Sequence, residues 1–109
     1  MAVFKNYEQT VIEALTRGTL PSDLIEKLNK EATLVDFEST GHGYYLTVKH
    51  KDLPKERIVC DKPSISGEAN GLVTGFVVFL VDRELTIECF AYDEKLPENF
   101  RDLSVIVSI

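Results

Sequence analysis

The spacing of the hydrophobic residues changes once along the chain, near residue 33. Before that point, apolar side chains recur every three or four residues along one helix face, at Phe4, Tyr7, Val11, Ile12 and Leu15. Gly18 follows at the position of a left-handed C-terminal cap. The pattern therefore predicts a helix over residues 4–17.

A second helix is predicted over residues 19–32, TLPSDLIEKLNKEA. One apolar stripe runs along it, at Leu24, Ile25 and Leu28. Thr19 or Ser22 is a suitable N-cap, and Pro21 suits a first turn. Because the connection between the two helices is very short, we expect them to lie side by side or at a sharp angle, with their stripes on a common surface.

From residue 33 onward, apolar and polar residues alternate, which is the pattern of β-strands. The segment TLVDFEST alternates Val35 and Phe37 with acidic residues, which predicts a strand with one solvated face. The turn sequence GHG and the alternating segment YYLTVKH then predict a hairpin. Further strands are predicted at residues 57–60, around 64–66, and at 103–109.

The segment 71–92, GLVTGFVVFLVDRELTIECFAY, is the strongest structural signal. If Asp82 and Arg83 are the central turn residues, three apolar pairs face each other across a hairpin: Leu80 with Leu85, Val78 with Ile87, and Phe76 with Cys89. We assign this face to the core under the helices. Arg83 is a poor residue for a tight turn of positive φ, so a longer loop could shift the register by one and exchange the two faces.

The opposite face of this hairpin is also apolar, with Val73, Val77, Phe79, Phe90 and Tyr92, and with Thr86 and Glu88 among them. Two helices are too few to cover both faces of the sheet. We therefore expect this second face to bind another molecule, through Val77, Phe79, Glu84, Glu88, Phe90 and Tyr92.

Together the elements predict an α+β fold, with two N-terminal helices packed on one face of a mostly antiparallel sheet of five or six strands. A length of 109 residues suits one domain, helical over 1–32 and sheet over 33–109.

The charge composition narrows the classes of molecule that the protein could bind. The net charge is −6, and residues 82–109 alone carry three basic and seven acidic side chains. This argues against nucleic acid and favours a basic protein partner, although excess acid also serves solubility alone. The longest apolar run, residues 76–81, is too short to cross a membrane, and MAVFKNYEQT lacks the apolar stretch of a signal peptide, so we expect a cytoplasmic protein.

No metal, cofactor or catalytic signature is recognised. The ligand types of a metal site are present in His42, His50, Cys60 and Cys89, but their spacing matches no known arrangement, and we predict none. His42 lies between two glycines, where a turn residue is the common case and a catalytic group the rarer one. Both cysteines are interpreted as buried or half-buried thiols.

The segments GHGYYLTVKHKDLPKERIVC and GFVVFLVDRELTIECFAYDEKLPENFRD resemble a family of small, uncharacterised bacterial α+β proteins with a GFxxFxxxxELTxECxxY pattern followed by PxxFR. The matching residues are Gly75, Phe76, Phe79, Glu84, Leu85, Thr86, Glu88, Cys89, Tyr92, Pro97, Phe100 and Arg101. This resemblance spans roughly residues 41–109 and implies a fold but no mechanism. In size, charge and layout the chain is also similar to immunity proteins of bacterial toxin systems.

Three functional hypotheses remain open. The first is a non-catalytic domain that binds a protein partner through the second sheet face, for instance an immunity protein that neutralises a basic toxin. The second is a homodimer of structural or unknown role that uses the same residues. The third, which ranks lowest, is an enzyme with a site near His42.

Overall fold

The computed structural model describes residues 3–92 and 95–109. Two N-terminal helices, α1 (Asn6–Thr16) and α2 (Ser22–Glu31), precede a seven-stranded sheet. The strands are β1 (Thr33–Ser39), β2 (Gly43–Lys49), β3 (Ile58–Cys60), β4 (Ser66–Ala69), β5 (Leu72–Val81), β6 (Glu84–Ala91) and β7 (Ile106–Ser108), and a short 3-10 helix, η1, spans Phe100–Asp102. The strand order is β1-β2-β6-β5-β4-β7, and β3 also pairs with β5. The α+β prediction is confirmed, with seven strands in place of the expected five or six.

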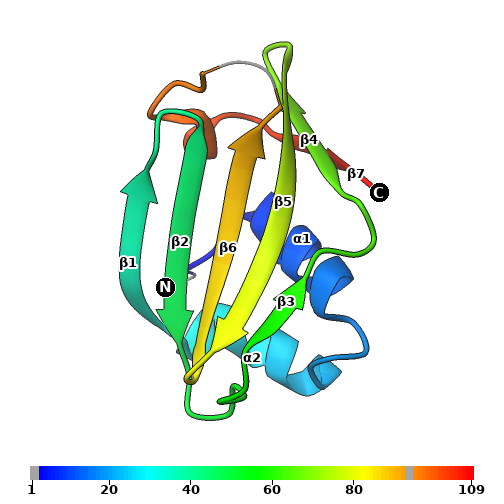
Figure 1. Cartoon of the computed structure of the whole chain (residues 1–109), viewed down its shortest axis with the longest axis vertical. Helices are drawn as coiled ribbons and strands as arrows, with labels where there is room; N and C mark the ends of the chain where they lie inside the picture. Colours follow the sequence, from blue (N-terminus) through cyan, green and yellow to red (C-terminus); the bar gives the residue numbers. More distant parts are fainter. Residues whose placement is uncertain (1–2, 93–94) are drawn as a thin grey trace.

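Every pairing in the sheet is antiparallel, and both helices lie behind it in the view of Figure 1. The helical spacing of α1 buries Val11, Ile12 and Leu15 against the sheet. Gly18 has the predicted left-handed conformation, with φ of +88°. It follows the extended C-cap residue Arg17, however, and lies in a turn in which the Thr19 N–H donates to the Thr16 carbonyl at 2.9 Å. Neither proposed cap of α2 was right, because Pro21 is its N-cap residue and no side chain closes that end.

The central hairpin of β5 and β6 has the register expected from its sequence. The three facing pairs are Leu80 with Leu85, Val78 with Ile87, and Phe76 with Cys89. All six side chains are buried and belong to one hydrophobic core with both helices. The alternative register, shifted by one residue, is wrong.

The turn of this hairpin is made by Asp82 and Arg83 with φ of 50° and 65°. Such positive φ values are costly for residues other than glycine. The preceding loop holds the turn in place. The amide of Asp82 donates to the carbonyl of Lys55 at 3.0 Å, and that of Arg83 to the carbonyl of Pro54 at 3.0 Å. The Arg83 guanidinium also donates to the Leu53 carbonyl at 2.6 Å.

Three strands differ from the sequence prediction. One is β4, which spans Ser66–Ala69 in place of the expected residues 64–66. In β1 the pairing to β2 shifts between Leu34 and Asp36, so Val35 lies in a bulge and does not share a face with Phe37. All seven residues of β1 are exposed. The C-terminal strand, expected over residues 103–109, is limited to β7.

Candidate interaction site

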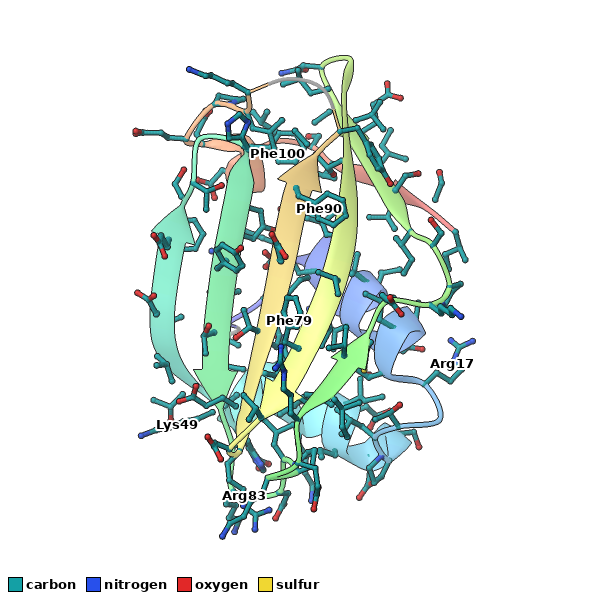
Figure 2. All side chains as sticks on the ribbon, in the orientation of Figure 1. Arg17, Lys49, Phe79, Arg83, Phe90 and Phe100 are labelled. Carbon is teal, nitrogen blue, oxygen red and sulfur yellow. The ribbon has the colours of Figure 1, made fainter. Side chains whose placement is uncertain are left out.

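The sheet has a second face, turned away from the helices, which we call the open face. Side chains alternate along a strand, so residues next to the core positions point to this side. Its apolar members are Val59, Val73, Val77, Phe79, Val81, Phe90 and Tyr92. Figure 2 shows Phe79 and Phe90 on the side of the sheet opposite the helices. In the part of the chain that the structure describes, no helix packs over this face.

Burial on the open face comes from neighbouring strands. Val59, Val73 and Tyr92 are 47%, 45% and 54% exposed, and Phe79 is half-buried because it lies opposite Val59 of β3. The core residues on the other side of the same strands are almost fully buried. The open face therefore exposes apolar side chains to solvent.

Phe90 has a local packing partner. It lies opposite Gly75, and a Cβ atom added to Gly75 would come within 2.6 Å of the Phe90 ring. The ring thus covers the backbone at the glycine, a known way to stabilise glycine in a strand. Tyr92 packs edge-on against Phe90, with ring centroids 5.8 Å apart. The Phe90 ring therefore has packing contacts with both Gly75 and Tyr92.

The open face is also acidic. The outward positions of the described strands carry the carboxylates Asp36, Glu38, Glu68, Glu84 and Glu88, and the cation Lys49. Glu88 lies between Val77 of β5 and Tyr45 of β2. A hydrogen bond to this carboxylate raises the pKa of the Tyr45 phenol, and the repulsion between the two negative charges that ionisation would create raises it further. Lys49 lies opposite Glu84, so that carboxylate is partly balanced.

All six predicted binding residues lie on this one surface, namely Val77, Phe79, Glu84, Glu88, Phe90 and Tyr92. The same face carries neighbours that the prediction did not include, chiefly Val59, Tyr45 and the acidic positions of β1. Their contribution depends on which strands are adjacent, and single-strand patterns do not contain that information.

The residues considered for a metal or catalytic site are dispersed. His42 is exposed in the turn before β2 and His50 is buried at the opposite end of that strand. Cys60 on β3 and Cys89 on β6 are separated by β5, which places them about 10 Å apart by ordinary strand spacing and too far for a disulfide. Burial raises the pKa of both thiols, for Cys89 to about 12. Among residues 3–92 and 95–109, no three His, Cys, Asp or Glu side chains form a potential metal cluster.

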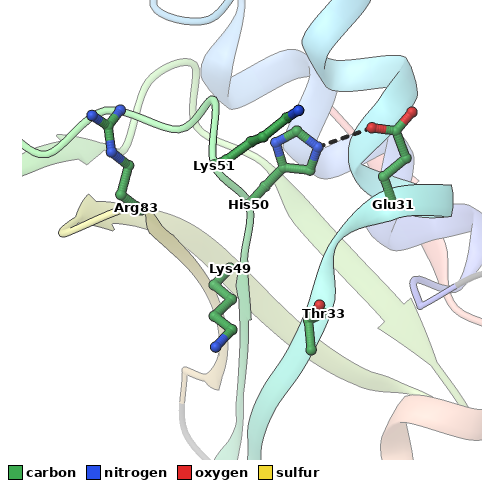
Figure 3. A pocket seen from close by; sticks show the side chains of 6 residues that line it. All are labelled: Glu31, Thr33, Lys49, His50, Lys51 and Arg83. Atoms are coloured by element: carbon green, nitrogen blue, oxygen red, sulfur yellow. Dashed lines mark hydrogen bonds and ion pairs between the residues drawn. The ribbon is translucent and has the colours of Figure 1, made fainter.

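His50 has a structural role. Its Nε2 lies 3.1 Å from Glu31 Oε1, and its Nδ1 accepts the backbone N–H of Asp52 at 3.1 Å. It lines a shallow hollow of about 390 Å³ with Glu31, Thr33, Lys49, Lys51 and Arg83. In Figure 3 Lys51 extends alongside His50, whereas Lys49 and Arg83 point in other directions. The three cations do not converge on one point, and Arg83 is already bound to the Leu53 carbonyl.

Sequence analysis missed a buried polar cluster under the sheet. Glu8 of α1 is fully buried and forms two hydrogen bonds of 2.9 Å with the Arg101 guanidinium. The Tyr44 hydroxyl donates to Glu8 at 2.6 Å, and Tyr7 lies 2.9 Å from that hydroxyl. One signal in the sequence could have revealed this cluster. Glu8 lies four residues before Ile12 and therefore on the apolar face of the helix, where a carboxylate needs a buried partner. The polar side chains of the cluster form hydrogen bonds with one another, and these bonds join α1, β2 and η1.

A scan against protein-family models, a search of curated proteins and a search of solved structures each found no match. Of the helices in the described ranges, neither has the length and apolar composition needed to cross a membrane. The open face is therefore the feature on which a functional proposal is based.

Proposed function

We propose that this protein is a non-catalytic interaction domain that binds a basic protein partner through the open face of its sheet. The observation that carries the proposal is the asymmetry of the sheet: one face forms the core with the helices, while the other is apolar, acidic and accessible. Contiguous apolar surface of this kind is uncommon on proteins that have no partner.

The hydrophobic and the charged residues of the open face contribute to binding in different ways. When a partner packs on Val77 and Phe79, their apolar surface is removed from water, and this burial drives association. Glu84 and Glu88 attract a basic surface and fix its position. An immunity protein that occludes a basic bacterial toxin is one instance of this function, and for that role we propose a cytoplasmic location.

A homodimer formed through the same face is the second candidate. It also buries the apolar residues, but a two-fold axis brings the same acidic surface of each copy together. The excess of carboxylates over cations on this face favours a basic partner over a second copy.

The test is Phe79→Asp, which adds a charge to the open face without touching the core. Ile109→Asp, at an exposed terminal residue, is the matched control. Each tagged variant is used as bait in extract of the native host, and the captured proteins are quantified by mass spectrometry. We expect a basic protein retained by wild type and by Ile109→Asp, and lost with Phe79→Asp.

Thermal melting followed by circular dichroism and sizing chromatography with light scattering accompany the capture. We expect all three proteins to be folded monomers. Identical captured proteins for both variants would reject the open face as the binding surface. A wild-type dimer that Phe79→Asp converts to monomer would replace the proposal with the homodimer.

A further inference from the structure

The edge strand β1 combines three features that no other described edge has. It is seven residues long, all of its residues are exposed, and in the described part of the chain only β2 pairs with it. The opposite edge of the sheet, β7, has three residues. In Figure 1 β1 forms the left edge of the sheet. Long exposed edges are templates for the pairing of another strand.

The free backbone groups of β1 follow from its pairing with β2. The Thr40 amide donates to the Gly43 carbonyl at 3.0 Å, and the same register pairs Glu38 with Tyr45. In antiparallel pairs, residues that bond to the partner alternate with residues whose N–H and C=O point away. Phe37 and Ser39 therefore present their backbone groups to the outside of the sheet.

The side chains of β1 define what could pair there. Asp36 and Glu38 point to the open-face side, opposite Thr47 and Tyr45. On the helix side, Leu34 and Phe37 are 54% and 40% exposed. One side of the edge is thus acidic and the other is apolar.

The Phe37 ring is held by neighbouring side chains in a position where an added strand could contact it. Its ring centroid lies 5.6 Å from that of Tyr44 and 5.6 Å from the Arg101 guanidinium carbon. An apolar side chain on an added strand would pack on this ring with little loss of Phe37 freedom.

A second copy of this chain does not fit the edge. Antiparallel pairing of β1 with itself about Phe37 places Asp36 opposite Glu38 of the second copy, twice. Like charges directly opposite each other in a sheet are destabilising. Basic residues at the same positions are attracted instead.

We propose that the β1 edge binds an extended segment of a partner protein as an added antiparallel strand, with Lys or Arg alternating with apolar residues. The basic side chains lie beside Asp36 and Glu38, and the apolar ones cover Leu34 and Phe37. Main-chain bonds to Phe37 and Ser39 supply affinity, and the alternation supplies specificity. This site shares Asp36 and Glu38 with the margin of the open face, but it uses the outward backbone groups of β1 and does not depend on the apolar residues of β5 and β6.

The test uses a fluorescein-labelled peptide of alternating lysine and valine, titrated with the full-length protein and followed by fluorescence anisotropy. In the proposed arrangement the valine N–H groups face β1 and the lysine N–H groups face solvent. We expect N-methylation of the valines to weaken binding by about tenfold or more, and N-methylation of the lysines to leave it nearly unchanged. Equal affinity of both methylated peptides would overturn the added-strand geometry.

Protein variants test the same contact from the other side. Ser39→Pro removes one outward N–H at an edge position without breaking the β1–β2 ladder, and Ser39→Val keeps that N–H. We expect weaker peptide binding for Ser39→Pro alone, and loss of binding for the double variant Asp36→Lys, Glu38→Lys. Phe79→Asp should bind the peptide as wild type does, so failure here is separable from failure of the open-face proposal. Unchanged affinity in the charge-reversed protein would reject the β1 site.

Discussion

Gly41 and Gly43 flank the same histidine, yet the structure gives them different tasks. Gly41 has φ of +85°, and a Cβ added there would meet nothing within 4 Å. Gly43 has φ of +154°, and an added Cβ would lie 1.7 Å from the Cys89 carbonyl oxygen. At Gly41 only backbone conformation demands glycine. At Gly43 the adjacent strand β6 occupies the space of a side chain.

Alanine substitutions at these two glycines therefore differ in cost. We expect Gly41→Ala to lower the free energy of unfolding by about 1 kcal/mol, the cost of a left-handed backbone with a Cβ atom. Gly43→Ala must also displace the backbone of β6, so we expect a loss of about 3 kcal/mol or more. Urea unfolding followed by circular dichroism measures both. Equal losses would show that β2 and β6 are not packed as closely as described.

At the scale of elements, the buried cluster connects parts of the chain that the sheet does not join. Glu8 of α1 and Arg101 of η1 are separated by 93 positions in sequence. An exposed ion pair, Lys5 with Asp102 at 3.0 Å, connects the same two regions at the surface. The two pairs differ mainly in burial, which makes them a natural comparison.

A double-mutant cycle separates the two contributions. Glu8→Gln and Arg101→Met each leave one charge of this largely buried pair without its partner, so we expect each to cost about 3 kcal/mol. The double variant should lose clearly less than the sum, because neither charge is then left alone. Lys5→Met and Asp102→Asn should each change stability by less than about 1 kcal/mol, because solvent screens that pair. Additive losses for Glu8 and Arg101 would contradict the coupling.

Sequence patterns predicted the elements that depend on local periodicity. The register of β5 and β6 followed from alternation around Asp82 and Arg83, although the loop that supports their positive φ could not be foreseen. The bulge at Val35 was missed because one extra residue changes the face without changing the composition. The Glu8–Arg101 pair was missed because no local pattern reports a contact across the whole chain. The open face was anticipated from two apolar sides of one hairpin, and its binding role stays a prediction.

At the scale of the whole molecule, buried acids that stay neutral make the fold sensitive to alkali. Burial is the main cause that raises the pKa of Tyr44 and Tyr7 above the ordinary 10.0, and that of Cys89 from 9.0 to about 12. The unfolded chain loses these protons at the ordinary values, whereas the folded chain keeps them. Above pH 9.0 for the thiol and 10.0 for the phenols, the unfolded state therefore binds fewer protons, and the free energy of unfolding must fall as pH rises.

Urea midpoints measured from neutral pH to pH about 11 test this linkage. We expect a constant midpoint at neutral pH and a steady decline once the unfolded thiol and phenols begin to ionise. Tyr44→Phe removes one of these protons, so its midpoint should start lower, because the bond to Glu8 is lost, and should then fall less steeply. Both effects have one cause, since the hydroxyl that stabilises the Glu8 carboxylate is the group that cannot ionise beside it. A Tyr44→Phe protein whose midpoint declines in parallel with wild type would show that the phenol titrates freely in the folded state, and hence that the cluster is open to water.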